Sequence, residues 1–185
     1  MNRRRWVGML LLLVAIGLLV DSLWITAKAY VAQGLIAHAW QQTLHNNTPQ
    51  KPWPWADTWP VGRLQVPSLG VDLYVLQGAQ GNALAFGPGY LEGTAALNSG
   101  GSTVLAGHRD THFNFLQQLH KGDGLLLTNS QGKQQRYVVS QHDVVNSQQQ
   151  TLQLPQDPAL LLVTCYPFQS LSSGPLRYVL TATAI

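Results

Sequence analysis

Cysteine is nearly absent from this chain of 185 residues, with Cys165 as its only example. A single thiol has no partner within the chain, so a fold held together by internal disulfides is excluded. Cys165 follows an apolar run over residues 160–164. The residue alone leaves two interpretations open: an inert thiol that packs as a small hydrophobic side chain, or a reactive nucleophile.

An excess of positive charge is also absent once the first residues are set aside. Three of the eleven lysines and arginines are Arg3, Arg4 and Arg5, and one of the eight acidic residues is Asp21. Eight basic and seven acidic side chains therefore remain from Lys28 onward. This near-neutral balance argues against the basic surface of a nucleic-acid-binding protein, so no nucleic-acid partner is expected.

The first long apolar stretch covers residues 6–27, with Asp21 as its only charge. Its 22 residues match the roughly 20 that a helix needs to cross a bilayer. Arginines precede the stretch and none directly follows it, which predicts a cytoplasmic N-terminus and an exported remainder. A cleavable signal peptide is the alternative, because Ala27-Lys28-Ala29 offers a small-x-small cleavage site. We favour an anchor, since apolar residues continue at helical spacing through Tyr30, Val31 and Leu35.

Three regions are predicted along the chain. Residues 1–27 hold the cytoplasmic arginines and the transmembrane anchor, and residues 28–57 hold a membrane-proximal helix followed by a linker rich in proline and tryptophan. Residues 58–185 are long enough for one globular domain. Export makes the unpaired cysteine unusual, because small exported domains commonly use cysteines in pairs.

The region 58–185 is predicted to be mainly β. Short β-type segments alternate there with turn signals rich in glycine, asparagine and serine, which is typical of a mostly antiparallel barrel or sandwich. Short helices are expected at 83–86 and 113–119. The predicted strands are 61–66, 71–76, 103–106, 124–128, 136–145, 160–164 and 177–184.

Three reactive side chains lie at the ends of these predicted strands. If 160–164 and 177–184 are antiparallel neighbours, Cys165 leaves one strand where Arg177 enters the next. His108 follows the strand 103–106 and can reach the same rim. A cysteine nucleophile needs such a partner, because a base or cation must favour the attacking thiolate.

These residues belong to motifs that resemble the three active-site motifs of the sortase family of cysteine transpeptidases. The motifs are Leu105-Ala106-Gly107-His108-Arg109-Asp110, Val163-Thr164-Cys165 and Leu176-Arg177-Tyr178. The resemblance covers residues 59–185 and implies a closed eight-stranded β-barrel with short helices. The short form with one N-terminal anchor most resembles the Gram-negative, proteobacterial type. That type implies a single-pass protein of the inner (cytoplasmic) membrane whose barrel lies in the periplasm. In a Gram-positive host the same topology would place the barrel on the outer face of the cytoplasmic membrane.

The resemblance also implies the chemistry. Cys165 would attack the Thr-Gly carbonyl of a protein substrate with a C-terminal sorting signal of the Leu-Pro-x-Thr-Gly kind, giving a thioacyl enzyme. An amine of unknown identity would then accept the acyl group. His108 would transfer protons and Arg177 would donate hydrogen bonds to the carbonyl oxygen, with no cofactor or metal. Substrate contacts are expected from Thr164 and from the connection 146–159, at Leu152, Leu154 and Pro155.

Several alternatives stay open. A hydrolytic cysteine peptidase would use the same three residues with water as the acceptor, and a non-enzymatic envelope-binding barrel would not need the thiol. His108 and His112 have a spacing that suits a metal on a helix, but the segment follows a strand and lacks a zincin glutamate, so we expect no metal. Asp110 could orient His108, or it could instead pair with Arg109 or cap the following turn, and we favour the latter kind of role.

Overall fold

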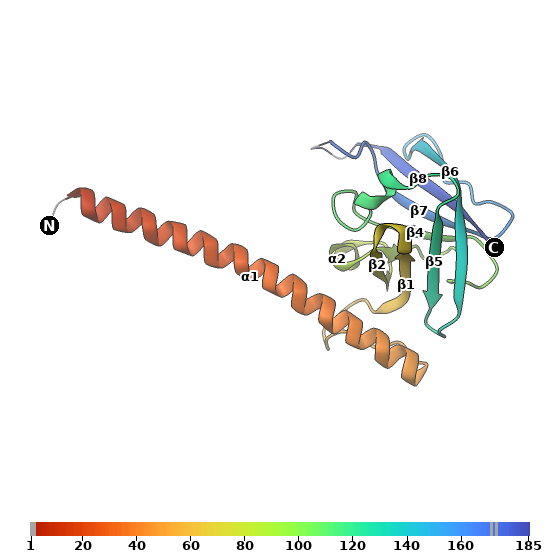
Figure 1. Ribbon diagram of the computed structural model, residues 1–185, viewed down its shortest axis with the longest axis horizontal. Helices are drawn as coiled ribbons and strands as arrows, with labels where there is room; N and C mark the ends of the chain where they lie inside the picture. The colour runs from red at the N-terminus through yellow and green to blue at the C-terminus, as the bar shows by residue number, and fades with distance from the viewer. Residues whose placement is uncertain (1–2, 171, 173) are drawn as a thin grey trace.

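The protein consists of a long N-terminal helix and a closed eight-stranded β-barrel, as a computed structural model shows (Figure 1). The structure describes residues 3–170, 172 and 174–185. The barrel confirms the predicted mainly β fold with short helices. Its strands are β1 (Pro60–Val66), β2 (Val71–Gln77), β3 (Gly89–Tyr90), β4 (Thr103–Ala106), β5 (Gly124–Asn129), β6 (Gln134–Asn146), β7 (Ala159–Cys165) and β8 (Leu176–Ala184).

The strands close in the order β1-β2-β3-β4-β7-β8-β6-β5. The pairs β2–β3 and β4–β7 are parallel, and the other pairs that the strand registers define are antiparallel. Because β4 and β7 run in the same direction, both end at the same rim of the barrel. Strand β8 begins at that rim, since it runs antiparallel to β7.

Alternation of side chains along the strands separates the core from the outer surface. On β7, Leu160 and Leu162 are fully buried in the main core inside the barrel. Leu161 belongs to a second, smaller cluster with Val104 and Val179 on the other face of the same strands. The barrel therefore has an apolar outer face next to the ends of β7 and β8.

Seven of the eight strands lie where the sequence predicts them, within two residues at each end. Strand β3 was not predicted, because its two residues are too few to show alternation. Gly89 allows it to form: a Cβ at this position would collide with the carbonyl oxygen of Gly78. The expected short helices are α2 (Gly81–Phe86) and the 3₁₀ helix η2 (Asn114–Gln118), and a further 3₁₀ turn, η1 (Pro67–Leu69), joins β1 to β2.

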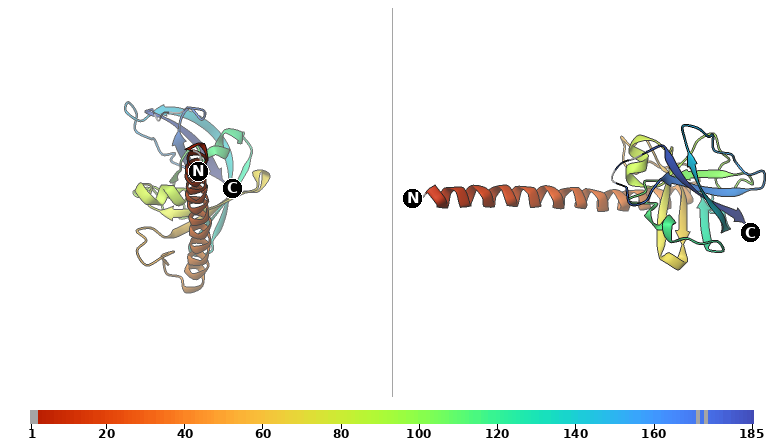
Figure 2. Two further views of the ribbon diagram at one scale, coloured as in Figure 1. Left: turned by 90° about the vertical axis from the view of Figure 1, so that its left-hand side faces the viewer. Right: turned by 90° about the horizontal axis from the view of Figure 1, so that it is seen from above.

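Helix α1 (Arg3–Asn46) is continuous across the two N-terminal regions and projects far from the barrel (Figures 1 and 2). Only its C-terminal part packs against the barrel, where Ile36 and Trp40 are each 1% exposed. Gln33 donates a hydrogen bond from Nε2 to the Phe86 carbonyl at 2.7 Å. Ile36 shares a small core with Leu76 and Ala83.

The transmembrane helix predicted over residues 6–27 is not found: no helix in the described part of the chain combines the length and apolarity of a membrane span.

Candidate active site

The strand registers place Cys165, Arg177 and His108 at one rim. Cys165 and Arg177 are register partners across β7 and β8, as the antiparallel prediction requires. Ala106 of β4 is level with Val163 of β7. Since these two strands are parallel, His108 and Cys165 each follow by two residues and lie at the same level. Cys165 is a free, half-buried thiol.

Two hydrogen bonds hold the backbone before His108 against β7. Gly107 donates its N–H to the Val163 carbonyl at 3.1 Å. The Thr164 hydroxyl donates to the Gly107 carbonyl at 2.7 Å, and Thr164 is only 3% exposed. The structure thus shows Thr164 as a link between the His108 and Cys165 segments, and its contact with substrate stays a prediction.

Glycine is required at position 107 by close packing. A Cβ there would lie 2.7 Å from the Phe113 ring, which is fully buried and has no room to move. The turn from His108 closes when Phe113 donates its N–H to the His108 carbonyl at 3.0 Å. The histidine therefore lies on a short turn that both the core and β7 fix in place.

Arg177 is held at the entry of β8 by its own loop. Its Nη1 donates to the carbonyl oxygens of Gly174 at 2.7 Å and Leu176 at 2.9 Å. Within the described residues, both of its hydrogen bonds come from Nη1, and the Nε and Nη2 donors have no partner there.

Asp110 pairs with Arg109, which is one of the two roles favoured from the sequence. Arg109 donates from Nε to Asp110 Oδ1 at 2.9 Å and from Nη2 to Oδ2 at 3.3 Å. This hydrogen bonding from Arg109 holds the pKa of Asp110 below its ordinary value. The Asp110 carboxylate therefore binds Arg109, the residue next to His108.

His112 is a second imidazole beside the site. Burial lowers its pKa from the ordinary value of 6.5, and the nearby His108 lowers the pKa further. The half-buried ring is thus stable in its neutral form. His108 and His112 lie on a turn between β4 and η2, so they do not have the helical spacing that the metal-binding interpretation requires.

We predict that His112→Gln changes how stability depends on pH. At and below about pH 6.5 the unfolded chain binds more protons than the folded chain, so acidification costs the wild-type protein stability. The melting temperature of the wild type relative to the variant should therefore fall as the pH is lowered from about 7 to 5. Thermal melts followed by circular dichroism measure this difference. His120→Gln, at an exposed position, reports the general effect of losing an imidazole. A difference that stays constant with pH would contradict the prediction.

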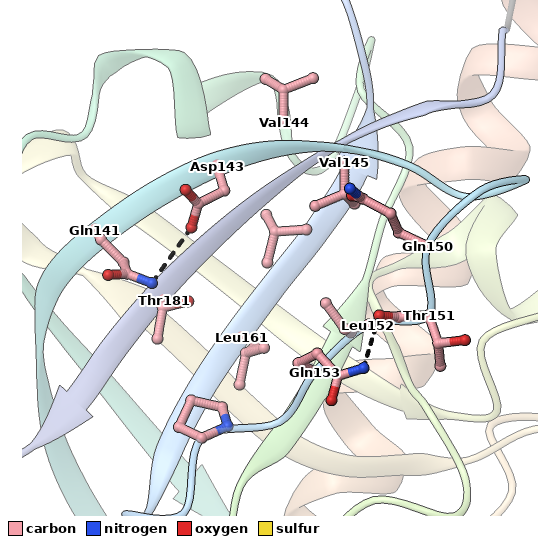
Figure 3. A pocket seen from close by; sticks show the side chains of 12 residues that line it. Gln141, Asp143, Val144, Val145, Gln150, Thr151, Leu152, Gln153, Leu161 and Thr181 are labelled. Carbon is pink, nitrogen blue, oxygen red and sulfur yellow. Dashed lines mark hydrogen bonds between the residues drawn. The ribbon is translucent and has the colours of Figure 1, made fainter.

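A groove lies on the outer face of the sheet. It extends to Val145 of β6, the register partner of Arg177, but Cys165, His108 and Arg177 are not among its lining residues. Leu161, Val163 and Cys165 alternate with the inward residues of β7, so all three face outward. Val179 and Thr181 of β8 are the register partners of Val163 and Leu161. Leu161, Val179 and Thr181 line a cavity of about 610 Å³, with the connection between β6 and β7 forming its other wall (Figure 3).

Of the three residues in that connection that were predicted to contact substrate, two line the cavity and one is exposed to solvent. Leu152 and Pro155 line the cavity, and Leu152 also packs on the outer apolar cluster. Leu154 is 43% exposed and is not among the lining residues. Strand β6 also lines the cavity, through residues that include Gln141, Asp143 and Val145, and the sequence did not predict this. Alternation along β6 was the available signal, but an irregularity between Val139 and Gln141 shifts the register.

The chain is similar to known proteins in sequence and in fold. The sortase domain family matches residues 64–185. Sortase D of Bacillus subtilis (strain 168) is 32% identical over 120 residues, which are 64% of this chain and 61% of that protein. Sortase A from Corynebacterium diphtheriae is 25% identical with a TM-score of 0.62, over 71% of this chain and 63% of that one. The chain thus spans about three fifths of the length of these two relatives.

Pilus-related Sortase C of Group B Streptococcus is 29% identical with a TM-score of 0.57, over 68% of this chain and 67% of that one. These relatives come from Gram-positive bacteria, so the predicted likeness to the Gram-negative type is not confirmed. The family match and the barrel agree, and the chain belongs to the sortase family, whose members are cysteine transpeptidases.

Proposed function

We propose that this protein is a cysteine transpeptidase that cleaves a sorting signal of the Leu-Pro-x-Thr-Gly kind and transfers the acyl group to an amine. The observation that carries the proposal is the register pairing of Cys165 with Arg177, with His108 held at the same level by β4. A thiolate, a proton-transfer group and a fixed cation at one rim are the groups that acyl transfer requires.

The reaction has two steps in this geometry. The Cys165 sulfur attacks the carbonyl carbon, the C–N bond to the following residue breaks, and His108 gives a proton to the leaving amine. Arg177 stabilises the negative charge that develops on the carbonyl oxygen. The acceptor amine then loses a proton to His108 and attacks the thioester, and Cys165 leaves as the thiolate.

The groove next to the rim suits the residues before the scissile bond. Its floor is apolar where Leu161 and Val179 lie, and Leu152 and Pro155 close it from the side. An extended peptide whose carbonyl lies at Cys165 would place its preceding leucine and proline over this floor. The cavity volume of about 610 Å³ is within the range of ligand pockets.

The experiment combines a Leu-Pro-x-Thr-Gly peptide with the full chain and measures intact mass. Transpeptidation predicts an acyl adduct on Cys165 and, when hydroxylamine or glycine amide is added, a product joined to that amine. Release of the free acid even with a saturating amine would indicate the hydrolytic alternative. The absence of any adduct with this and related signals would refute the enzymatic proposal and leave the envelope-binding alternative.

Membrane attachment is a separate part of the proposal. Leu10 to Leu13, Leu18 and Leu19 are between 61% and 68% exposed along α1, and an apolar surface of this extent suits lipid. With arginines before it, the segment would hold the barrel on the outer side of the cytoplasmic membrane. The full chain should stay with carbonate-washed membranes, whereas a chain without residues 1–27 should not. Recovery of the full chain in the soluble fraction would refute attachment, and its N-terminal mass shows whether the segment is cleaved.

A further inference from the structure

Arg109 connects the turn that carries His108 to the loop that follows Cys165. Its side chain is 6% exposed. Nη1 donates to the Pro167 carbonyl at 2.7 Å, and Nη2 donates to the Ser170 carbonyl at 2.6 Å. The remaining contact is the ion pair with Asp110, whose side chain is 69% exposed. A guanidinium with a fixed fork of donors can hold three acceptors at once in this way.

The loop that Arg109 holds joins the nucleophile to the catalytic arginine. It begins directly after Cys165 and ends where β8 starts at Leu176. Arg177 binds the Gly174 carbonyl at the far end of the same loop. Arg109 therefore binds the first part of the loop at Pro167 and Ser170, while Arg177 binds Gly174 near its end.

The charge of Arg109 also interacts with the thiol. Hydrogen bonding to Asp110 raises the pKa of Arg109, and the nearby Cys165 adds to this effect. The Arg109 guanidinium is thus within electrostatic range of Cys165, although its donors are used on the loop carbonyls and on Asp110.

We propose that Arg109 is a positioning residue that fixes the loop after Cys165 against the His108 turn, so that sulfur and imidazole are aligned before substrate binds. The expected effect on the rate rests on the proposed function. The expected effect on the order of the loop rests only on the hydrogen bonds of Arg109. Loss of this alignment acts on the chemical step, because misplacement by about 1 Å can cost on the order of 10²-fold in rate.

The test compares Arg109→Ala and Arg109→Lys with two controls in the full chain. Arg109→Ala should lower kcat by up to about 10²-fold with little change in KM, and it should speed amide exchange in residues 166–170. Arg109→Lys keeps a charge but not the fork, and should give intermediate values of both. Asp110→Asn removes the charge of the ion pair but keeps both loop carbonyls as partners of Arg109, so its kcat should lie between those of Arg109→Ala and the wild type. Arg136→Ala removes an exposed arginine and should remain close to the wild type.

Two results would overturn the inference: wild-type kcat in both Arg109 variants, or a lower kcat with unchanged exchange in the loop. If Arg109→Ala does not fold, Arg109→Lys decides by the same two measurements. If the wild type forms no acyl adduct with any sorting peptide, the proposed function fails. Amide exchange, together with the rate at which iodoacetamide modifies Cys165, then still decides whether Arg109 orders this segment.

Discussion

Replacement of Cys165 by alanine should abolish acyl transfer, with a loss on the order of 10⁴-fold or more in kcat. The reason is that the thioester forms on this sulfur alone, since the sequence contains no second cysteine. His108 and Arg177 would remain in place but would have no nucleophile to activate. Product formation from a sorting peptide and an amine, followed by mass spectrometry, measures the loss.

The fold should tolerate this substitution. Cys165 is half-buried at the rim, outside the main core, so the Cys165→Ala protein should have nearly the same melting temperature as the wild type. Cys165→Ser provides the matched variant, because it keeps a nucleophilic atom of similar size but forms no thioester. Turnover by Cys165→Ala within tenfold of the wild type would exclude Cys165 as the nucleophile.

The second large effect concerns stability and lies far from the rim. Trp40→Ala should lower the free energy of unfolding by about 3–5 kcal/mol, the usual cost of truncating a buried aromatic residue. Trp40 is 1% exposed, and its ring centroid lies 6.3 Å from that of Tyr74 on β2. Truncation would leave a cavity between α1 and the barrel. Chemical denaturation followed by circular dichroism measures the change.

Trp55→Ala is the matched control for this prediction. Trp55 is 83% exposed in the linker after α1, so its removal should alter stability by no more than about 0.5 kcal/mol. Equal effects of the two substitutions would show that α1 does not contribute its packing to the stability of the barrel.

The site was predictable because strand ends can be recognised locally. The turn signals and apolar runs around 160–164 and 177–184 placed Cys165 and Arg177 at adjacent ends, and the structure makes them register partners. The resemblance to sortases added the barrel and its closure. Closure itself depends on pairings between distant strands, such as β1 with β5, and no local pattern in the sequence records these.

The sequence predicted a helix where α1 lies but did not predict which face of the helix packs against the barrel. The apolar residues that supported its continuation, Tyr30, Val31 and Leu35, are exposed in the structure. The buried positions form another stripe on the helix: Ala32, Ile36, Ala39, Trp40 and Thr43. Their helical spacing was present in the sequence, but the small residues among them gave the stripe little hydrophobic contrast.

The side-chain directions in the connection 146–159 were harder to predict than those in the strands. Leu152, Leu154 and Pro155 have similar apolar character, yet two of them line the cavity and one is exposed. A loop has no fixed side-chain period, so composition alone does not assign its inward positions. Thr164 was predicted to contact substrate, although alternation along β7 directs its side chain to the interior.

The packing of α1 also sets the limits of the autonomous folding unit. The family match begins at residue 64, but Ile36 and Trp40 fill the surface formed by β2 and α2. A fragment cut to the family boundary would expose Leu76 and Tyr74 to solvent and would be prone to self-association. Proteolysis should therefore leave a resistant core that begins near Ala32, about thirty residues ahead of the region that sequence comparison recognises.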